Sequence, residues 1–263
     1  QVDVSTDPRW PRNSGTYGER PEVTAAITRE LVRGYQNGPD GLNEGSVVLT
    51  VKHFPGDGPA ENATGTFTLA GQTQTVPVVD GAARAAFTIE NVHLWDGLDD
   101  PYLYTATASL SSGDEVSVRF GCRKFEIDPQ KGFLLNGRSY PLRGVSRHQD
   151  RKGAGNALPP AMMEEDMAII KELGANTLRL AHYQHAQHFY DLCDENGLVV
   201  WAEIPYITQH LHSGRANTLS QMEELVIQNY NHPCIAVWGL SNEITAASAV
   251  NEELLENHRA LND

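Results

Sequence analysis

Short apolar runs alternate with helical patterns through the C-terminal half of the chain. The runs cover residues 142–146, 178–181, 198–204 and 234–240 and are rich in aliphatic and β-branched residues. Helical patterns, with apolar residues every three or four positions, follow at residues 160–173, 185–196, from 217 or 218 onward, and at 248–261. Strands that alternate with helices pair in parallel, so the pattern predicts four βα units built on one sheet.

The first of these helices has clear boundaries. Pro160 suits a first helical turn because its φ is fixed, and Gly174 follows where the helix should end. The residues expected to face the core are Met163, Met167, Ile170 and Leu173 in this helix and Met222, Leu225 and Val226 in the third. Gly197 closes the second helix. Four βα units amount to half of an eight-unit (β/α)8 TIM barrel, which is the fold we expect for residues 129–263.

Residues 61–128 follow a different pattern, in which apolar and polar positions alternate. The predicted strands are residues 65–70, 74–79, 83–89, 102–108 and 115–120, separated by turn signals such as Asp80-Gly81 and Asp96-Gly97. Strands spaced by about ten residues are typical of an antiparallel β-sandwich. The chain is therefore expected to be multi-domain, with an all-β part before the α/β part.

Residues 1–60 fit neither pattern. A turn-rich loop precedes a predicted helix with apolar residues at Val23, Ile27, Leu31 and Tyr35, and a predicted strand at residues 46–51 leads to Lys52 and His53. One helix and one strand cannot bury both of their faces, so this segment must pack against another part of the protein.

Composition narrows the possible partners. The chain has 263 residues, with 20 basic and 34 acidic side chains, and its formal net charge is −14. Nucleic acids and anionic membranes need a positive surface, so neither is an expected partner. Residues 1–20 lack the apolar core of a signal peptide and no run of about 18 apolar residues occurs, which favours a cytoplasmic location. The three cysteines, Cys122, Cys193 and Cys234, have no metal-type spacing.

The strongest chemical candidate is the pair Asn242-Glu243, which follows the apolar run 234–240. In a βα-barrel the carboxyl ends of the strands form the rim that carries catalytic side chains. A carboxyl group placed there beside Trp238 would have its pKa raised by desolvation and could act as a general acid. The alternative is a Ser-Asn-Glu helix cap without chemistry.

Three motifs in order resemble glycoside hydrolase family 2, which includes β-galactosidases, β-glucuronidases and β-mannosidases. They are Gly132 to His148, Asn176 to Tyr183 and Asn231 to Glu243, and within the family they look most similar to the β-galactosidases. The resemblance implies a retaining glycosidase with Glu243 as acid/base. It places the nucleophile glutamate on the seventh barrel strand, which this chain does not reach.

The resemblance also implies a set of sugar-binding residues. Asn242 would contact the sugar 2-hydroxyl and His182 would bind the sugar. Arg143, Arg147, His148 and Arg179 resemble polar residues beneath and around the subsite, several of which would orient Glu243. Trp201 is a candidate stacking surface or a core residue. Glu203 is a supporting residue or a structural ion-pair partner. His210-x-His212 is too weak a pattern for a metal site, so we predict neither metal nor cofactor.

The N-terminal part resembles other proteins. Residues 1–60 look like part of a glycoside hydrolase family 3 barrel, in which Arg12, Lys52 and His53 would hold a sugar. Their neighbours in that family are missing here, so we expect them to have no function. Residues 92–104 resemble the second immunoglobulin-like domain of family 2, which makes residues 61–128 a partial immunoglobulin-like β-sandwich. The join between the two resemblances falls near residues 59–65.

Two functional hypotheses from different classes follow. The first is a β-galactosidase-like retaining glycoside hydrolase, present as a fragment, that acts on an oligosaccharide or another β-glycoside. The second is an inactive chimeric or truncated fragment that at most binds a sugar or a partner. A family 3 β-glucosidase is disfavoured because its motifs occupy only the first quarter of the chain. Exposed sheet edges would favour a homo-oligomer or a complementing barrel half.

Overall fold

The structure, a computed structural model, describes residues 63–79, 81–244 and 249–262. The predictions for residues 1–60, including Arg12, Lys52 and His53, lie outside this part of the chain. The chain divides into two compact units, Gln1–Phe87 with Thr107–Val116 and Thr88–Ala106 with Ser117–Asp263. None of the helices in the described ranges is long and apolar enough to cross a membrane.

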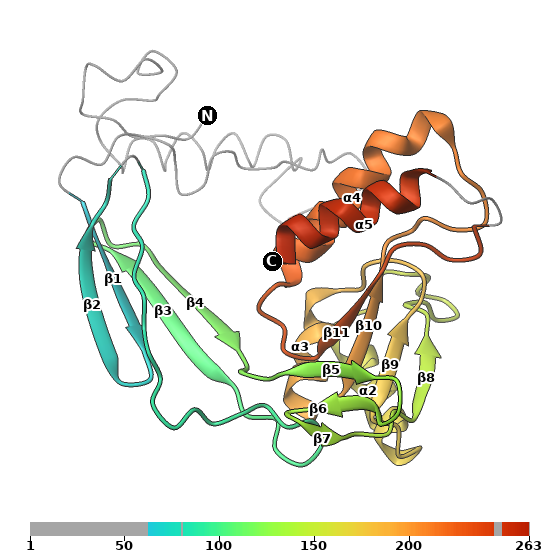
Figure 1. Ribbon diagram of the computed structural model, residues 1–263, viewed down its shortest axis with the longest axis horizontal. Coiled ribbons are helices and arrows are strands. Elements are labelled where there is room, and N and C mark those ends of the chain that lie inside the picture. Colours follow the sequence, from blue (N-terminus) through green and yellow to red (C-terminus); the bar gives the residue numbers. More distant parts are fainter. Residues whose placement is uncertain (1–62, 80, 245–248, 263) are drawn as a thin grey trace. The chain divides into compact units, whose positions relative to one another are not determined.

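An open four-stranded sheet contains β1 (Thr64–Leu69), β2 (Gln72–Pro77), β3 (Tyr104–Leu110) and β4 (Glu115–Phe120), in the order β2-β1-β3-β4 (Figure 1). Strands β1 and β2 form a hairpin through Ala70 and Gly71, whose φ angles of +48° and +77° suit the twist of a two-residue turn. Hydroxyl pairs join the strands, with Thr66 Oγ1 3.0 Å from Thr75 Oγ1.

The strand predicted at residues 83–89 is wrong. Its side chains alternate between half-buried and exposed positions as predicted, but the segment forms no ladder with a neighbouring strand in the described chain. The Gln74 side chain instead donates a hydrogen bond to the Ala86 carbonyl. Alternation of apolar and polar residues indicates which side chains are buried, but it does not show that a partner strand is present.

A three-stranded antiparallel sheet precedes the barrel strands. It contains β5 (Phe125–Asp128), β6 (Gly132–Leu135) and β7 (Arg138–Ser139), in the order β5-β6-β7. The sequence analysis missed this sheet, although Asn136-Gly137 is a strong signal for a two-residue hairpin turn. Both residues have positive φ, +52° and +78°, as that turn requires.

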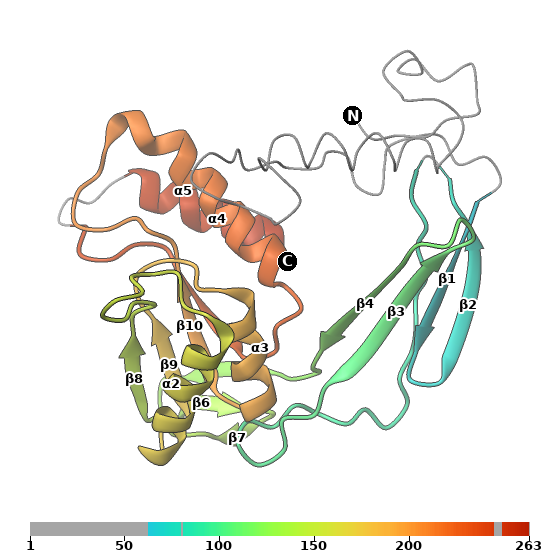
Figure 2. The same cartoon turned by 180° about the vertical axis from the view of Figure 1, so that it is seen from behind.

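The predicted βα units are confirmed as a partial TIM barrel. Strands β8 (Gly144–Arg147), β9 (Thr177–Leu180), β10 (Val199–Glu203) and β11 (Ile235–Gly239) form one parallel sheet in the order β11-β10-β9-β8. The associated helices are α2 (Pro160–Glu172), α3 (Gln187–Asn196), α4 (Arg215–Asn229) and α5 (Ala249–Asn262), with a short 3₁₀ turn η2 (His212–Gly214) before α4. Figure 2 shows these elements from behind. Helix boundaries differ from the predictions by two residues or fewer, except that α4 begins two or three residues early.

The two faces of this sheet differ in what covers them. On one face Leu178, Val200 and Ile235 lie side by side in register and are at most 2% exposed, because helices pack over them. On the other face Arg179 lies in register with Trp201, and Trp201 remains 45% exposed. Trp201 is therefore not a core residue in the described chain. This second face is the one that a complete barrel would enclose.

Core predictions for the helices hold with one exception. Met163, Met167 and Ile170 of α2 are buried, and so are Met222, Leu225 and Val226 of α4. Leu173 is 67% exposed, so its predicted core position is wrong. It caps the end of α2, where Gly174 with a φ of +73° turns the chain away from the helix axis.

Candidate functional site

The site residues lie where the parallel strands end. His182 comes two residues after β9, Glu203 is the last residue of β10, and Asn242 follows β11 by three residues. Backbone hydrogen bonds carry the pairing past the strands, because Asn242 N–H donates to the Tyr206 carbonyl at 2.9 Å and Thr208 N–H donates to the Asn242 carbonyl at 2.9 Å. Three segments far apart in sequence thus meet at one edge of the sheet.

Arg179 joins the side chains of these three segments. Its Nε donates to Glu203 Oε1 at 2.5 Å, and its Nη2 donates to Glu203 Oε2 at 3.2 Å and to Asn242 Oδ1 at 2.6 Å. A guanidinium bound to a carboxylate through two nitrogens is both strong and well oriented. Glu203 is only 2% exposed, so Arg179 neutralises a carboxylate that water does not reach. We call Arg179, Glu203, Asn242 and His182 the arginine cluster.

His182 completes the arginine cluster with a defined ring orientation. Its Nδ1 lies 3.0 Å from Glu203 Oε2 and 3.0 Å from Arg179 Nη2. Both hydrogens of Arg179 Nη2 are already used, by Glu203 and Asn242, and a guanidinium cannot accept a hydrogen bond. Nδ1 therefore carries a hydrogen and donates to Glu203. In the neutral ring this leaves Nε2 as a hydrogen-bond acceptor.

The remaining predicted residues lie around the arginine cluster. The rings of His148 and His182 meet edge to face, with centroids 5.1 Å apart, and His148 is exposed. Trp201 and Glu203 share one face of the sheet with Gly239, whose added Cβ would lie 2.4 Å from Trp201 Nε1 and 2.7 Å from Glu203 Cγ. Only glycine permits this close approach between β10 and β11.

Glu243 differs from its prediction. Its side chain is exposed, so the expected burial against Trp238 is wrong. Trp238 pairs with Ala202 on the face covered by helices, whereas Glu243 lies four residues past the end of β11, where the alternation of the strand no longer places it. Glu243 has a φ of +54°, and its carboxylate forms no hydrogen bond or ion pair with the residues that the structure describes. Its role as acid/base stays a prediction.

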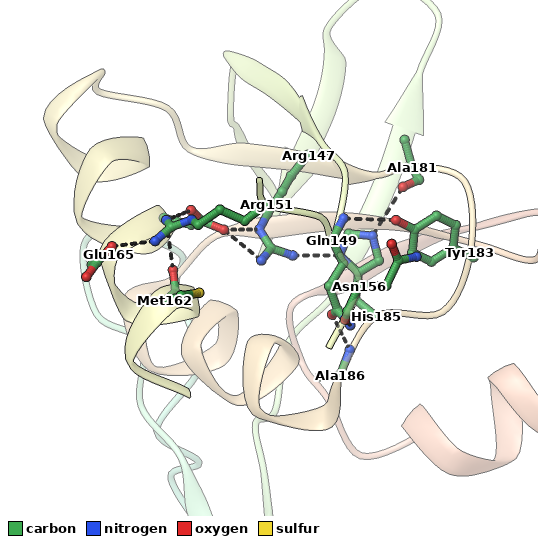
Figure 3. A network of polar contacts seen from close by, with 11 residues as sticks. Arg147, Gln149, Arg151, Asn156, Met162, Glu165, Ala181, Tyr183, His185 and Ala186 are labelled. Carbon is green, nitrogen blue, oxygen red and sulfur yellow. Dashed lines mark hydrogen bonds and ion pairs between the residues drawn. The ribbon is translucent and has the colours of Figure 1, made fainter. Parts of the chain in front are cut away.

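Behind the strand ends lies a second polar network (Figure 3). Arg147 donates to Asp166 Oδ2 from Nε at 3.0 Å and from Nη2 at 2.8 Å, while Arg151 donates to Asp166 Oδ1 at 2.7 Å. The Arg147 guanidinium also stacks on the ring of Phe189 in α3 at 3.8 Å. Arg147 therefore faces the helices and not the open face of the sheet.

This network reaches the site through His185. Burial lowers the pKa of His185 to about 4, so its ring is neutral at pH 7. Its Nδ1 lies 3.0 Å from Arg147 Nη1 and accepts its hydrogen, and its Nε2 donates to the Ala181 carbonyl at 3.2 Å. Since Ala181 directly precedes His182, the network holds the backbone of the arginine cluster. Sequence reasoning missed Asp166 and His185, because neither lies in a recognisable motif.

The possible metal ligands are already engaged in protein contacts. His210 Nδ1 lies 3.0 Å from the Tyr206 hydroxyl. Within the described ranges, Asp191, Asp194 and His232 form the group with ligand spacing. Asp194 is bonded to His232 Nδ1 at 2.6 Å and to the backbone N–H of Cys234 at 3.0 Å. This group lies before β11, at the end of the strand opposite Asn242.

Two parts of the chain match different families of known proteins. Residues 125–263 match the TIM barrel domain of glycosyl hydrolases family 2, and residues 1–82 match the N-terminal domain of glycosyl hydrolase family 3. A β-glucuronidase of Bacteroides fragilis is 41% identical over 196 residues, which cover 68% of this chain and 28% of the relative.

Two further similarities involve proteins named for other sugars. A β-galactosidase of Thermoanaerobacterium thermosulfurigenes is 37% identical over 164 residues, which cover 59% of this chain and 22% of the relative. The solved structure of a β-galacturonidase from Eisenbergiella tayi, bound to galacturonate, superposes with a TM-score of 0.68 at 28% identity, covering 76% of this chain and 38% of that one. The chain thus spans less than a third of the length of these two curated relatives.

Proposed function

Because the chain belongs to glycosyl hydrolase family 2, we propose that it forms the first half of the catalytic barrel of a retaining β-glycosidase. The observation that carries this proposal is the arginine cluster, which brings together Glu203, Asn242 and His182 from three neighbouring strand ends. That edge of the sheet is where barrel enzymes place their catalytic groups. The substrate is a terminal β-linked sugar of an oligosaccharide or another β-glycoside.

Asn242 is the proposed contact for the sugar 2-hydroxyl. Its Oδ1 accepts the hydrogen bond from Arg179 Nη2, so the Nδ2 hydrogens are the free donors of the amide. Arg179 thereby fixes which end of the amide faces a ligand. A donor in that position bonds a hydroxyl oxygen, and such a contact strengthens in the transition state of glycoside hydrolysis.

Glu243 is the proposed acid/base, and its partner carboxylate is a glutamate outside these 263 residues. Retaining glycosidases need two carboxyl groups about 5 to 5.5 Å apart, one of which attacks the sugar. Glu203 does not qualify as the nucleophile, because it is 2% exposed and accepts hydrogen bonds from Arg179 and His182. We assign Glu203 the role of holding Arg179 and His182 in place.

His182, His148 and Trp201 complete the proposed sugar site. His182 offers Nε2 as an acceptor for a sugar hydroxyl, and the exposed His148 ring stands against it. Trp201 is 45% exposed on the open face, which leaves its ring free to pack against a sugar.

Closure of the barrel requires more chain. Strands β8 and β11 are the outer strands of the parallel sheet, so each has one strand partner within the described residues. Unpaired strand edges favour the addition of further strands. We propose that a complementing barrel half pairs with them, either from the same protein or in an assembly with a second molecule.

The parts before the barrel are assigned by resemblance. We propose that residues 61–128 are a partial immunoglobulin-like β-sandwich, a reading that the antiparallel strands β1 to β4 support. Residues 1–60 are assigned to a segment of a family 3 barrel, in agreement with the match over residues 1–82.

The test is to supply the missing half. The 263-residue chain is assayed alone and fused to the segment that follows the matching region in the Bacteroides fragilis β-glucuronidase, using 4-nitrophenyl β-galactoside, β-glucoside and β-glucuronide. We expect turnover in the fused protein only. Glu243→Gln should lower its kcat by at least about 100-fold, because general acid–base catalysis contributes 10² to 10⁴.

The matched control is Glu223→Gln, which makes the same change at an exposed position of α4. It should leave kcat unchanged. A folded fusion whose turnover survives Glu243→Gln, or which hydrolyses none of the three substrates, would refute the proposal. The chain would then be an inactive fragment that binds a sugar or a partner.

A further inference from the structure

A pocket of about 350 Å³ is lined by residues from segments 120–123 and 230–233 and by Trp238 of β11. Its lining includes Arg123, Tyr230, Asn231 and Trp238, all of which belong to the second compact unit. No residue of the arginine cluster contributes to it. The pocket is therefore separate from the proposed sugar site at the strand ends.

Arg123 is the charged group of this pocket. Its Nε donates to the Pro233 carbonyl at 3.0 Å, its Nη2 donates to the Ile235 carbonyl at 3.0 Å, and its guanidinium carbon lies 4.3 Å above the ring of Phe125. The carbonyl oxygens accept hydrogen bonds from the guanidinium but do not neutralise its charge. Across the described ranges, Nη1 has no hydrogen-bond partner and no carboxylate lies within ion-pair distance of Arg123.

Other guanidinium groups of the same unit are neutralised. Arg147, Arg151 and Arg179 each lie within 2.8 Å of a carboxylate oxygen. The carboxylate of Asp194 does not fill this role, because its two oxygens accept hydrogen bonds from His232 Nδ1 and from the Cys234 backbone N–H. Burial lowers the pKa of Arg123, yet a guanidinium stays charged near neutral pH. Among the described residues, Asp194 attracts this half-buried positive charge from a distance but forms no ion pair with it.

The walls of the pocket suit a flat or apolar ligand. Trp238 is half-buried and Tyr230 is 61% exposed, so aromatic surface stands beside the guanidinium. Asn231 is exposed and adds an amide without charge. The chain carries a formal net charge of −14, so this positive pocket differs in sign from the protein as a whole.

We propose that the pocket binds a small carboxylate, whose charged group pairs with Arg123 Nη1 and whose ring or apolar part packs against Tyr230 and Trp238. Carboxylates match the planar guanidinium in shape and charge. The aromatic walls select a carboxylate that carries a ring over one that does not.

The experiment compares a charged probe with a neutral one of the same shape. Benzoate and benzamide are titrated into the 263-residue chain, and binding is followed by calorimetry and by the tryptophan fluorescence to which Trp238 contributes. We expect saturable binding of benzoate and at least tenfold weaker binding of benzamide. Binding of both probes with equal affinity, or saturable binding of neither, would overturn the proposal.

A substitution then locates the site. Arg123→Gln would also remove the structural hydrogen bonds to the Pro233 and Ile235 carbonyls, so the charge is altered at Asn231 instead. Asn231→Asp places a negative charge in the pocket and should weaken benzoate binding about tenfold or more by repulsion. The matched control is Asn217→Asp, the same change at an exposed position of α4, which should leave the affinity unchanged.

Equal benzoate affinity in the wild type and in Asn231→Asp, with both proteins folded, would place the binding elsewhere and reject the assignment. Tyr230→Ala should also weaken benzoate, by about threefold to tenfold, through the loss of its ring. None of these readouts uses glycoside hydrolysis, so their failure leaves the proposed function untouched.

Discussion

Replacing Arg179 by leucine should destabilise the barrel unit by about 3 kcal/mol. Glu203 is 2% exposed and would keep only the contact with His182, so its charge would be buried with one partner removed. Breaking one side of a buried ion pair typically costs about 3 to 5 kcal/mol, and the remaining bond to His182 places Arg179→Leu at the lower end.

The measurement is urea unfolding followed by circular dichroism at 25 °C. With a urea dependence of roughly 2 kcal/mol per M, the midpoint should fall by about 1.5 M. Arg143→Leu is the matched control, because Arg143 is exposed, and it should change stability by less than about 0.5 kcal/mol.

A double variant separates charge burial from lost packing. Arg179→Leu combined with Glu203→Leu removes both charges, and a buried ion pair replaced by apolar residues is often neutral in stability. The double variant should therefore be more stable than Arg179→Leu alone by about 1 to 2 kcal/mol. If it is no more stable than the single variant, the reasoning from an unpaired Glu203 charge fails.

Two further predictions concern the same unit. Gly239→Ala should cost about 1 to 3 kcal/mol of unfolding free energy, since the added Cβ would lie 2.4 Å from Trp201 Nε1. Gly214→Ala, whose Cβ would lie in ordinary contact 3.6 Å from Leu211 Cβ, should be nearly neutral in the same urea assay. The buried His185 has its pKa lowered from 6.5 to about 4, so the unfolded chain binds a proton first as the pH falls. Stability should therefore be full above about pH 6.5 and decrease toward pH 4, by about 2 kcal/mol between pH 7 and pH 5 from this group. Urea midpoints for the wild type should show this loss, and an equal decrease in His185→Gln would contradict it.

The sequence predicted the barrel half well because both of its signals are local. Apolar runs and helix boundaries such as Pro160 and Gly174 depend on neighbouring residues, and the four strands and four helices appear within a few residues of their predicted places. The strand at residues 83–89 failed because a ladder depends on a partner far along the chain. The core prediction for Leu173 failed because the apolar periodicity in the sequence continues past the residue at which the helix ends.

The sequence predicted which residues form the candidate site better than it predicted how they are arranged. Strand ends identified His182, Glu203 and Asn242, whereas the position of Arg179 between them depends on the register of three strands. The error at Glu243 arose because Trp238 faces the helices while Glu243 lies beyond the end of β11. Asp166 and His185 were beyond prediction, since their contact with Arg147 joins a helix, a strand and a loop.

The arginine cluster also distinguishes the correct alignment of the strands from its nearest competitors. Because side chains alternate across a sheet, sliding β10 by a single residue would turn Glu203 toward the apolar layer under the helices. There the carboxylate would meet aliphatic side chains in place of Arg179, a cost that adds to the loss of apolar burial by Val200 and Ala202. The polar contacts of Arg179 across three strands thus make any shift of β10 by an odd number of residues energetically unfavourable.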